Sequence, residues 1–285
     1  MKPEPYPNLS LFVSDFLSWS PKGERHTMEH PFFSLSKKKK DTKPRHYESP
    51  DGKAQLTVTP TVLGLPTIWD KDLLIYTATL IREAMNKGTL GSENKAIRID
   101  TANFMEATVK GDGTQQRKGL IDTLDRLKGC MVKTTIETAG TSYTEAFSLL
   151  DSYKIAVKTK TGKVAALEIK VCDWLYGAIW NAEQEMLSIN REYFKLEGGI
   201  ERRLYELARK HCGRQPFWKV GMETLWEKSG STAELKKFRH MIFKGQADLG
   251  TLPDYRVQLK PELDQVWFFS KHHKDHIQAV LDTNL

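Results

Sequence analysis

Along residues 70–171 the hydrophobic positions change from a helical to an alternating period. Apolar residues first recur every three to four positions, as in amphipathic helices. This predicts three helices, over about 70–88, from 100 or 101, and over about 114–129. Alternation then predicts two hairpins of β-strands, 131–136 with 143–150 and 153–158 with 164–171. A short strand near residues 56–62 precedes them. Three helices followed by hairpins is the order of a winged helix–turn–helix unit.

The same order of elements recurs after residue 199, with little residue identity between the halves. Helices are predicted over 199–211, 220–228 and 232–246, strands over 255–259 and 265–269, and a last helix over 271–281. We therefore predict an α+β fold of two tandem winged helix–turn–helix domains. The first is predicted over residues 54–187 and the second over residues 188–285. A single α+β domain of unrelated topology is the alternative.

Residues 1–53 differ in composition from the rest of the chain. They contain seven of its 12 prolines and the run Lys37–Lys40. Proline removes backbone donors and like charges repel, so we predict a flexible, basic, extended arm. Its short apolar patches, 9–12 and 32–33, could still dock on a neighbouring surface.

Composition narrows the class of protein. The chain has 285 residues, of which 39% are hydrophobic, so a sizeable core is expected. No apolar run is long enough for a membrane span, and the N-terminus does not resemble a secretory signal. Cys130, Cys172 and Cys212 form no metal or disulfide spacing, which favours the cytoplasm. The net charge of +7 favours an anionic partner, most often nucleic acid.

Motifs for catalysis are missing from the sequence. There is no phosphate-binding G-x-x-x-x-G-K-[ST] loop and no pair of histidines flanking one apolar residue, which metal-dependent nicking initiators need. His272 and His276 could share a helix face and hold a metal, but a solvated terminal helix is the simpler interpretation. We predict no enzymatic activity, no cofactor and no metal.

The candidate DNA-binding residues lie on the third predicted helix of each half and at a hairpin tip. The third helix of the first half carries polar groups that can contact phosphates or base edges. They lie opposite an apolar stripe formed by Leu120, Ile121, Leu124 and Leu127. The acid Asp122 lies among these polar groups and would have to accept from a cytosine or orient a neighbour. The third helix of the second half is more basic. For each helix the alternative is a face that is simply solvated, and for the hairpin the alternative is a solvated tip. The candidates are Gln115, Lys118 and Arg126; Lys236, Lys237, Arg239, His240 and Lys244; and, at the hairpin tip, Lys158, Lys160 and Lys163.

A longer pattern resembles plasmid replication initiators of the replication initiator protein A family. It includes residues 201–213, Trp218, residues 225–231, Phe238-Arg239 and residues 252–255, and runs from about Ile68 to Phe269. The resemblance implies two winged-helix domains that bind direct repeats (iterons) at a plasmid origin as monomers. It assigns dimerisation and DNA binding to the first domain and DNA binding to the second. It also implies dimers that repress their own promoter, opening of an adjacent A·T-rich region, and recruitment of the host initiator and replicative helicase.

Four functions remain to be weighed. The favoured one is a sequence-specific duplex-DNA binder that initiates plasmid replication without catalysis, through two basic readers joined by residues 181–190. A winged-helix transcriptional repressor would look the same in sequence. An enzymatic function is disfavoured because the sequence lacks the corresponding motifs. A function as a protein-interaction scaffold does not explain why basic residues fall on the third helix of each half.

Overall fold

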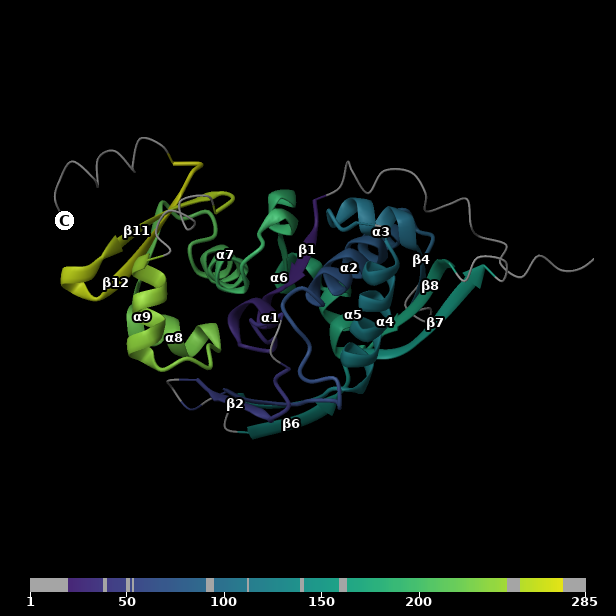
Figure 1. Cartoon of the computed structure of the whole chain (residues 1–285), viewed down its shortest axis with the longest axis horizontal. Helices are drawn as coiled ribbons and strands as arrows, with labels where there is room; N and C mark the ends of the chain where they lie inside the picture. The colour runs from purple at the N-terminus through teal and green to yellow at the C-terminus, as the bar shows by residue number, and fades with distance from the viewer. Residues whose placement is uncertain are drawn as a thin grey trace, which may run out of the picture.

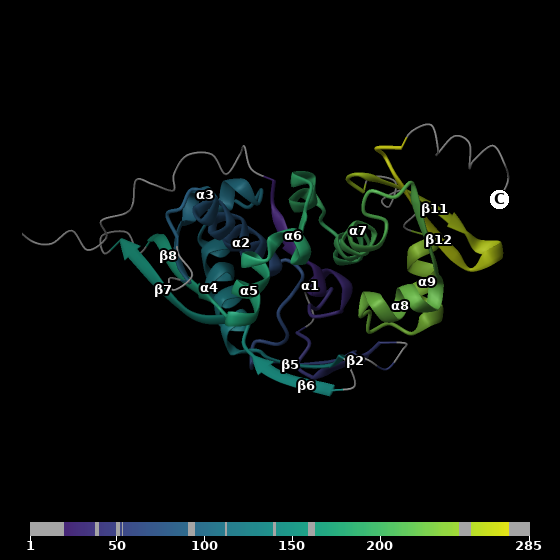
Figure 2. The ribbon, with the colours of Figure 1, turned by 180° about the vertical axis from the view of Figure 1, so that it is seen from behind.

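The structure, a computed structural model, describes residues 20–37, 40–49, 52, 54–90, 95–111, 113–138, 141–158, 163–244 and 252–273. These residues form a mixed α+β fold with two groups of helices and sheets side by side (Figure 1). The segment α1 (Arg25–Glu29) and β1 (Lys22–Glu24) lies between the groups in both views (Figures 1 and 2).

The first group has the element order helix, strand, helix, helix, hairpin. Its first strand pairs with the last, which gives an antiparallel sheet of order β4–β8–β7. This pairing brings the hairpin back beside the helices, as in winged-helix folds. The elements are α2 (Lys71–Asn86), β4 (Ala96–Asp100), α3 (Thr101–Ala107), α4 (Thr114–Gly129), β7 (Leu150–Lys158) and β8 (Lys163–Val171). They are followed by α5 (Asp173–Trp180) and α6 (Ala182–Glu185).

The second group repeats that order and that pairing. Its sheet has the order β10–β12–β11, so again the first strand lies beside the last. The elements are α7 (Gly199–His211), β10 (Phe217–Gly221), α8 (Met222–Ser229), α9 (Leu235–Lys244), β11 (Tyr255–Lys260), η3 (Pro261–Leu263) and β12 (Gln265–Ser270). We call the two groups the first and second winged-helix-like units.

An additional antiparallel sheet is inserted into the first unit. The strands β5 (Met131–Thr138) and β6 (Thr141–Phe147) follow α4 and precede β7. They join β2 (Arg45–Glu48) and β3 (Ala54–Thr59) in the order β2–β3–β5–β6, and Figure 2 shows this sheet at the lower edge of the molecule. The hairpin 131–150 was predicted, but its separation from the β4–β8–β7 sheet was not.

Residues 20–37 and 40–49 are packed, in contrast to the predicted extended arm. The strand β1 pairs with β9 (Met186–Ser188), and the carboxylate of Glu24 caps α1 by accepting from two backbone N–H groups at 2.6 Å. Met28 is buried in the second core, and Phe32 and Phe33 are buried in the first. Burial of these three side chains outweighs the effect of proline and lysine on this segment. Residues 1–19, 38–39, 50, 51 and 53 of the predicted arm lie outside the described residues.

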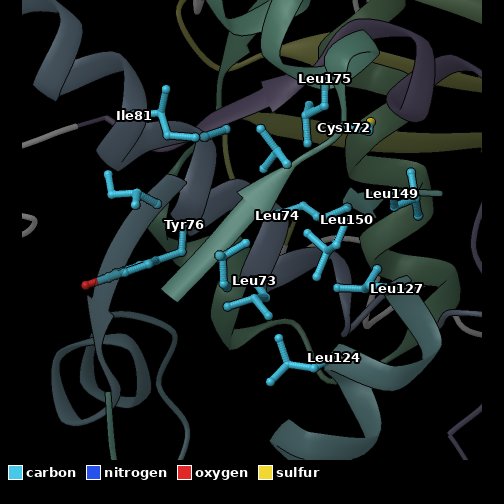
Figure 3. Close-up of a cluster of buried hydrophobic side chains, with 14 of the residues drawn as sticks. Leu73, Leu74, Tyr76, Ile81, Leu124, Leu127, Leu149, Leu150, Cys172 and Leu175 are labelled. Carbon is cyan, nitrogen blue, oxygen red and sulfur yellow. The ribbon is translucent and has the colours of Figure 1, made fainter. Parts of the chain in front are cut away.

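The first core follows the predicted helical stripes. Side chains of α2 and α4 meet residues of the strands and of α5, as Figure 3 shows for Leu73, Leu124, Leu150 and Leu175. Two details differ from the prediction. Ile121 is 37% exposed, because α4 turns it away from the core. Val62 is 92% exposed and lies beyond β3.

Within the two winged-helix-like units, the sequence pattern did not predict the short strands β4 and β10. The strand β4 lies directly before α3, and β10 contains Val220, which was expected to begin a helix. Each is five residues long, so alternation over so short a stretch is hard to distinguish from the start of a helix. The last predicted helix falls mainly on residues after 273, outside the described part of the chain.

A network of buried charges joins α2 of the first unit to α7 of the second. Lys71 Nζ lies 2.9 Å from Glu206 Oε1, and Arg203 Nη1 lies 3.2 Å from Glu206 Oε2. Arg202 Nη1 lies 2.6 Å from Asp72 Oδ1. All five side chains are at most 3% exposed. Three buried cations therefore share two carboxylates, and the half-buried Lys110 also lies 2.9 Å from Asp72 Oδ2 through its Nζ.

The remaining donors of the arginines bind carbonyl oxygens at the ends of helices. Arg203 donates to Met28 O and Glu29 O of α1 and to Lys228 O of α8, at 2.6–3.1 Å. Arg202 donates to Phe194 O and Leu196 O, at the end of η2 (Arg191–Lys195). Free carbonyls at a helix C-terminus carry partial negative charge, so they offset the excess of buried cations.

Removal of one carboxylate from this network should strongly destabilise the chain. We expect Glu206→Gln to lower the free energy of unfolding by about 3 kcal/mol, because Lys71 and Arg203 remain buried without their counter-charge. Denaturant unfolding of wild type and variant measures this difference. The exposed Glu227→Gln is the control and should change stability by less than about 0.5 kcal/mol. Equal stability of the two variants would contradict the assigned role of Glu206.

Stability should also fall in mild acid. Burial lowers the pKa of His30 and of His211 to about 4, from an ordinary value of 6.5. Between pH 6.5 and 4 the unfolded chain therefore binds more protons than the folded chain, and the free energy of unfolding decreases as the pH falls. Urea unfolding at a series of pH values should show this loss, with a shallower slope in His211→Gln. A slope identical to wild type in that variant would exclude His211 as a contributor.

Candidate nucleic-acid interface

The helix α9 is anchored by two apolar side chains and exposes its basic ones. Phe238 and Ile242 are buried at 0% and 1% exposure in the second core. The 100° step of an α-helix then places other positions toward solvent. The exposed residues include four of the predicted DNA-binding residues: Lys236, Lys237, His240 and Lys244.

The turn before α9 is held by local hydrogen bonds. Gly230 ends α8 in the left-handed conformation, with φ of 69°, where a side chain would also approach Pro31 Cβ to within 2.4 Å. Trp226 Nε1 donates to Ala233 O at 2.7 Å, which fixes the far side of the turn. The turn between α8 and α9 is therefore stabilised by contacts within the chain.

Arg239 is bound within the protein. Its Nε and Nη2 each donate to one carboxylate oxygen of Asp264, both at 2.7 Å. These bonds lower the pKa of Asp264. The backbone carbonyl of Asp264 accepts from Met222 N at 2.9 Å, so the same turn joins α9, α8 and the β11–β12 hairpin. Arg239 was predicted among the DNA-binding residues, but two of its guanidinium donors are already bound by Asp264.

In the first unit, the predicted surface of α4 is divided. Gln115 and Lys118, near the N-terminal end, are exposed. Arg126, two turns later, donates through Nε and Nη2 to Asp70, both at 2.7 Å. Asp70 stands at the N-cap position of α2, but its carboxylate accepts from Arg126 and Thr123 instead of capping the helix. At the N-terminal end of α4 the side chains of Gln115 and Lys118 are therefore exposed to a partner. At the C-terminal end the guanidinium of Arg126 is bound by Asp70.

The β7–β8 hairpin carries fewer uncompensated charges than its sequence indicates. Lys154 pairs with Glu168 at 2.6 Å and Lys170 with Asp151 at 3.6 Å, across the hairpin. Lys158 is exposed at the end of β7, and its backbone pairs with that of Lys163. The side chain of Lys163 and all of Lys160 lie outside the described residues.

The three-stranded sheet of the second unit contributes basic residues that the sequence analysis did not select. Lys219 Nζ and Lys260 Nζ lie over the ring of Trp267, at 5.7 and 5.3 Å from its centroid. Arg256 is exposed on the adjacent strand β11. Alternation along 256–260 could have revealed this outward face, because every second residue there is polar and the others are buried.

Possible catalytic or metal groups in the described residues have structural explanations. Glu24, His26 and Glu185 bring ligand atoms within 4.8 Å of one another. Both oxygens of Glu24, however, already accept backbone N–H groups of α1, and burial raises its pKa. The half-buried His211 stacks on Trp218, with ring centroids 4.7 Å apart, and Trp218 packs against the second core. His276 of the weighed metal pair lies outside the described residues.

None of the described helices combines the length and the apolarity that a membrane-spanning segment needs.

Most of the chain matches a known protein family. Residues 22–257 match the model of the family described as Replication initiator protein A. The chain belongs to the replication initiator protein A family. The resemblance noted in the sequence is thereby confirmed, and the match begins within the segment that was predicted as an arm. The family assigns the chain to the initiation of DNA replication.

Relatives agree with this assignment. The chain is 36% identical over 262 residues to a protein of Wigglesworthia glossinidia brevipalpis named "Putative replication protein", covering 90% of this chain and 92% of that relative. Its fold is similar to a crystal structure of domains 2 and 3 of RctB, with a TM-score of 0.61 at 13% identity, covering 84% and 94% of the two chains. A second RctB domain 2–3 structure gives a TM-score of 0.58 at 12% identity, covering 86% and 97%. At these identities, the structural likeness supports the fold alone.

Replacement of the two adjacent lysines of α9 tests this surface. We expect Lys236→Ala/Lys237→Ala to weaken binding to duplex DNA. The slope of log K against log salt should also fall by about 0.9 for each phosphate that the variant no longer neutralises. Fluorescence anisotropy at several salt concentrations measures both quantities.

The matched control is Lys87→Ala/Lys195→Ala, which removes the same charge from the C-terminal end of α2 and from η2. It should leave the salt slope near that of the wild type. If both double variants reduce the slope equally, the effect is one of net charge and α9 is not the contact surface.

Proposed function

We propose that this protein is a sequence-specific, double-stranded DNA-binding initiator of plasmid replication. In this proposal it binds direct repeats at the origin, promotes opening of the adjacent duplex and recruits the host initiator and replicative helicase, without catalysis of its own. As a dimer in equilibrium with the monomer, it represses its own gene from an inverted-repeat operator. The observation that carries the proposal is α9, which exposes four basic or polar donors on a helix anchored by Phe238 and Ile242 in a replication-initiator family member.

The two units are proposed to contribute unequally to recognition. In α9, Lys236, Lys237 and Lys244 can reach phosphates or guanine edges, and His240 adds a further donor or acceptor. In α4, the N-terminal turn exposes Gln115 and Lys118, and acids lie farther along the helix. We therefore assign base recognition mainly to α9, and a narrower contact, with one candidate base reader in Gln115, to α4. The hairpins, through Lys158 and Lys260, are assigned to the DNA backbone.

A footprint on DNA flanking the protein's own gene tests the proposal. Purified protein is compared on this duplex and on a scrambled duplex at about 150 mM salt, where specific binders exceed non-specific binding by about 10³-fold or more. Regularly spaced protected repeats, with one protein per repeat, are the expected result. Protection of a lone inverted repeat over the promoter would favour a repressor without a role in initiation. Equal binding to both duplexes would overturn the proposal.

The contribution of α4 to base recognition can be measured separately. We expect Gln115→Ala to relax discrimination between bases more than it lowers total affinity, because a glutamine amide can pair with adenine while the surrounding phosphate contacts remain. Binding to the native site and to single-base variants of it gives both values. A uniform loss of affinity on all sequences would mean that Gln115 contacts only the DNA backbone.

A further inference from the structure

We infer that the buried charge network between α2 and α7 sets the spacing and helical phase of the DNA site that this protein accepts. Its positioning residues are Lys71, Asp72, Arg202, Arg203 and Glu206. The inference rests on the proposed function, because it concerns how the two units present their reading surfaces to one duplex. It adds the class of substrate: a duplex whose two contact segments stand at one fixed separation.

The network joins the two helices on which the units are built. In the first unit, α2 packs in the same core as α4, and in the second unit, α7 packs in the same core as α9. Ile75 of α2 is buried in the core of the second unit, so apolar packing crosses the same boundary as the ion pairs. The positions of α4 and α9 relative to each other therefore depend on the contact between α2 and α7.

The network leaves little freedom for rotation at this boundary. A hinge motion would separate Lys71 from Glu206 and Arg202 from Asp72 at once, and all four groups are buried. It would also strip Arg203 from carbonyls of α1 or α8. Buried groups that are separated from their partners in this way carry a large desolvation penalty, so the boundary has one favoured geometry.

The connection between the units is also tied down. Residues 181–190, which link them in sequence, include β9, and β9 is hydrogen-bonded to β1. Arg209 Nε donates to Ser188 O at 2.6 Å, and Arg25 Nη1 donates to Gln184 O at 2.6 Å. This segment is thus part of the packed structure and does not act as a flexible tether.

If the two units are held rigidly, the two DNA segments that they contact must have a fixed separation and helical phase. Each inserted base pair moves the second contact segment by about 3.4 Å and rotates it by about 34°, given about 10.5 base pairs per turn. An insertion of five base pairs therefore places the second segment on the opposite face of the duplex. A protein with freely moving units would still bind both segments, whereas a rigid one would bind through one unit alone.

The test uses the wild-type chain and its own site. After footprinting has located the two protected segments within one repeat, insertions of two and five base pairs are placed between them, and affinity is measured by anisotropy. We expect the five-base-pair insertion to lower affinity at least tenfold, to the level of DNA that carries the α9 segment alone. Protection of both segments with less than a twofold decrease in affinity would overturn the inference. Failure to bind the uninserted site would overturn the proposed function instead.

A variant identifies the network as the cause. Asp72→Asn weakens the link to Arg202 while Lys71–Glu206 remains, and it should reduce the affinity penalty of the five-base-pair insertion by at least threefold. Its binding to DNA with the α9 segment alone should equal that of the wild type, which also reports that the second unit is folded. Glu227→Gln should keep the full penalty. If Asp72→Asn lowers affinity for all DNAs in proportion, or leaves the penalty unchanged, the network does not set the spacing.

Discussion

The structure depends on how three buried cations are accommodated between α2 and α7. Two carboxylates cannot neutralise Lys71, Arg202 and Arg203, and an uncompensated charge in the interior is strongly unfavourable. The balance comes from peptide carbonyls at the ends of α1, η2 and α8, which the arginines reach with several donors each. The arginines therefore fix the ends of three helices as well as the contact between the units. The positions of the N-terminal segment, the second helix–turn–helix and the first unit all follow from this arrangement.

The two winged-helix-like units share a topology but have diverged in how they use arginine. Arg126 on α4 and Arg239 on α9 occupy candidate DNA-facing positions, and each is held by an aspartate through two hydrogen bonds. In α4 this pairing removes Arg126 from the predicted DNA-facing surface. In α9 four other candidates stay exposed, so the pairing of Arg239 matters less. Arg126 and Arg239 therefore stabilise the fold of each unit, and the exposed lysines of α4 and α9 remain available for DNA.

Much of the fold could be predicted from local periodicity, while the pairing of charges could not. The stripes of α2, α4, α7 and α9 span several turns, so their 3.6-residue period is unambiguous. The five-residue strands β4 and β10 are too short for such a signal. Arg126 and Asp70 are 56 residues apart, and Arg239 and Asp264 are 25 apart, so no local pattern links them. The packing of residues 20–37 and 40–49 was missed for the same reason, because Met28 and Phe33 are buried against partners far along the chain.

The long reach of these contacts has a consequence for the synthesis of the protein. Thr27 O and Arg203 Nη1 meet across 176 residues, and β1 pairs with β9. A ribosome that adds roughly 5–20 residues per second needs roughly 10–35 s to cover that distance. During this interval Phe32 and Phe33 can pack against the first core as it is made, but Met28 of α1 lacks most of the second core, because α7 has not been made. A nascent chain thus passes through a long stage in which its N-terminal segment is exposed to chaperones and proteases. The rate of translation through residues 30–203 then becomes one determinant of how much folded protein each message yields.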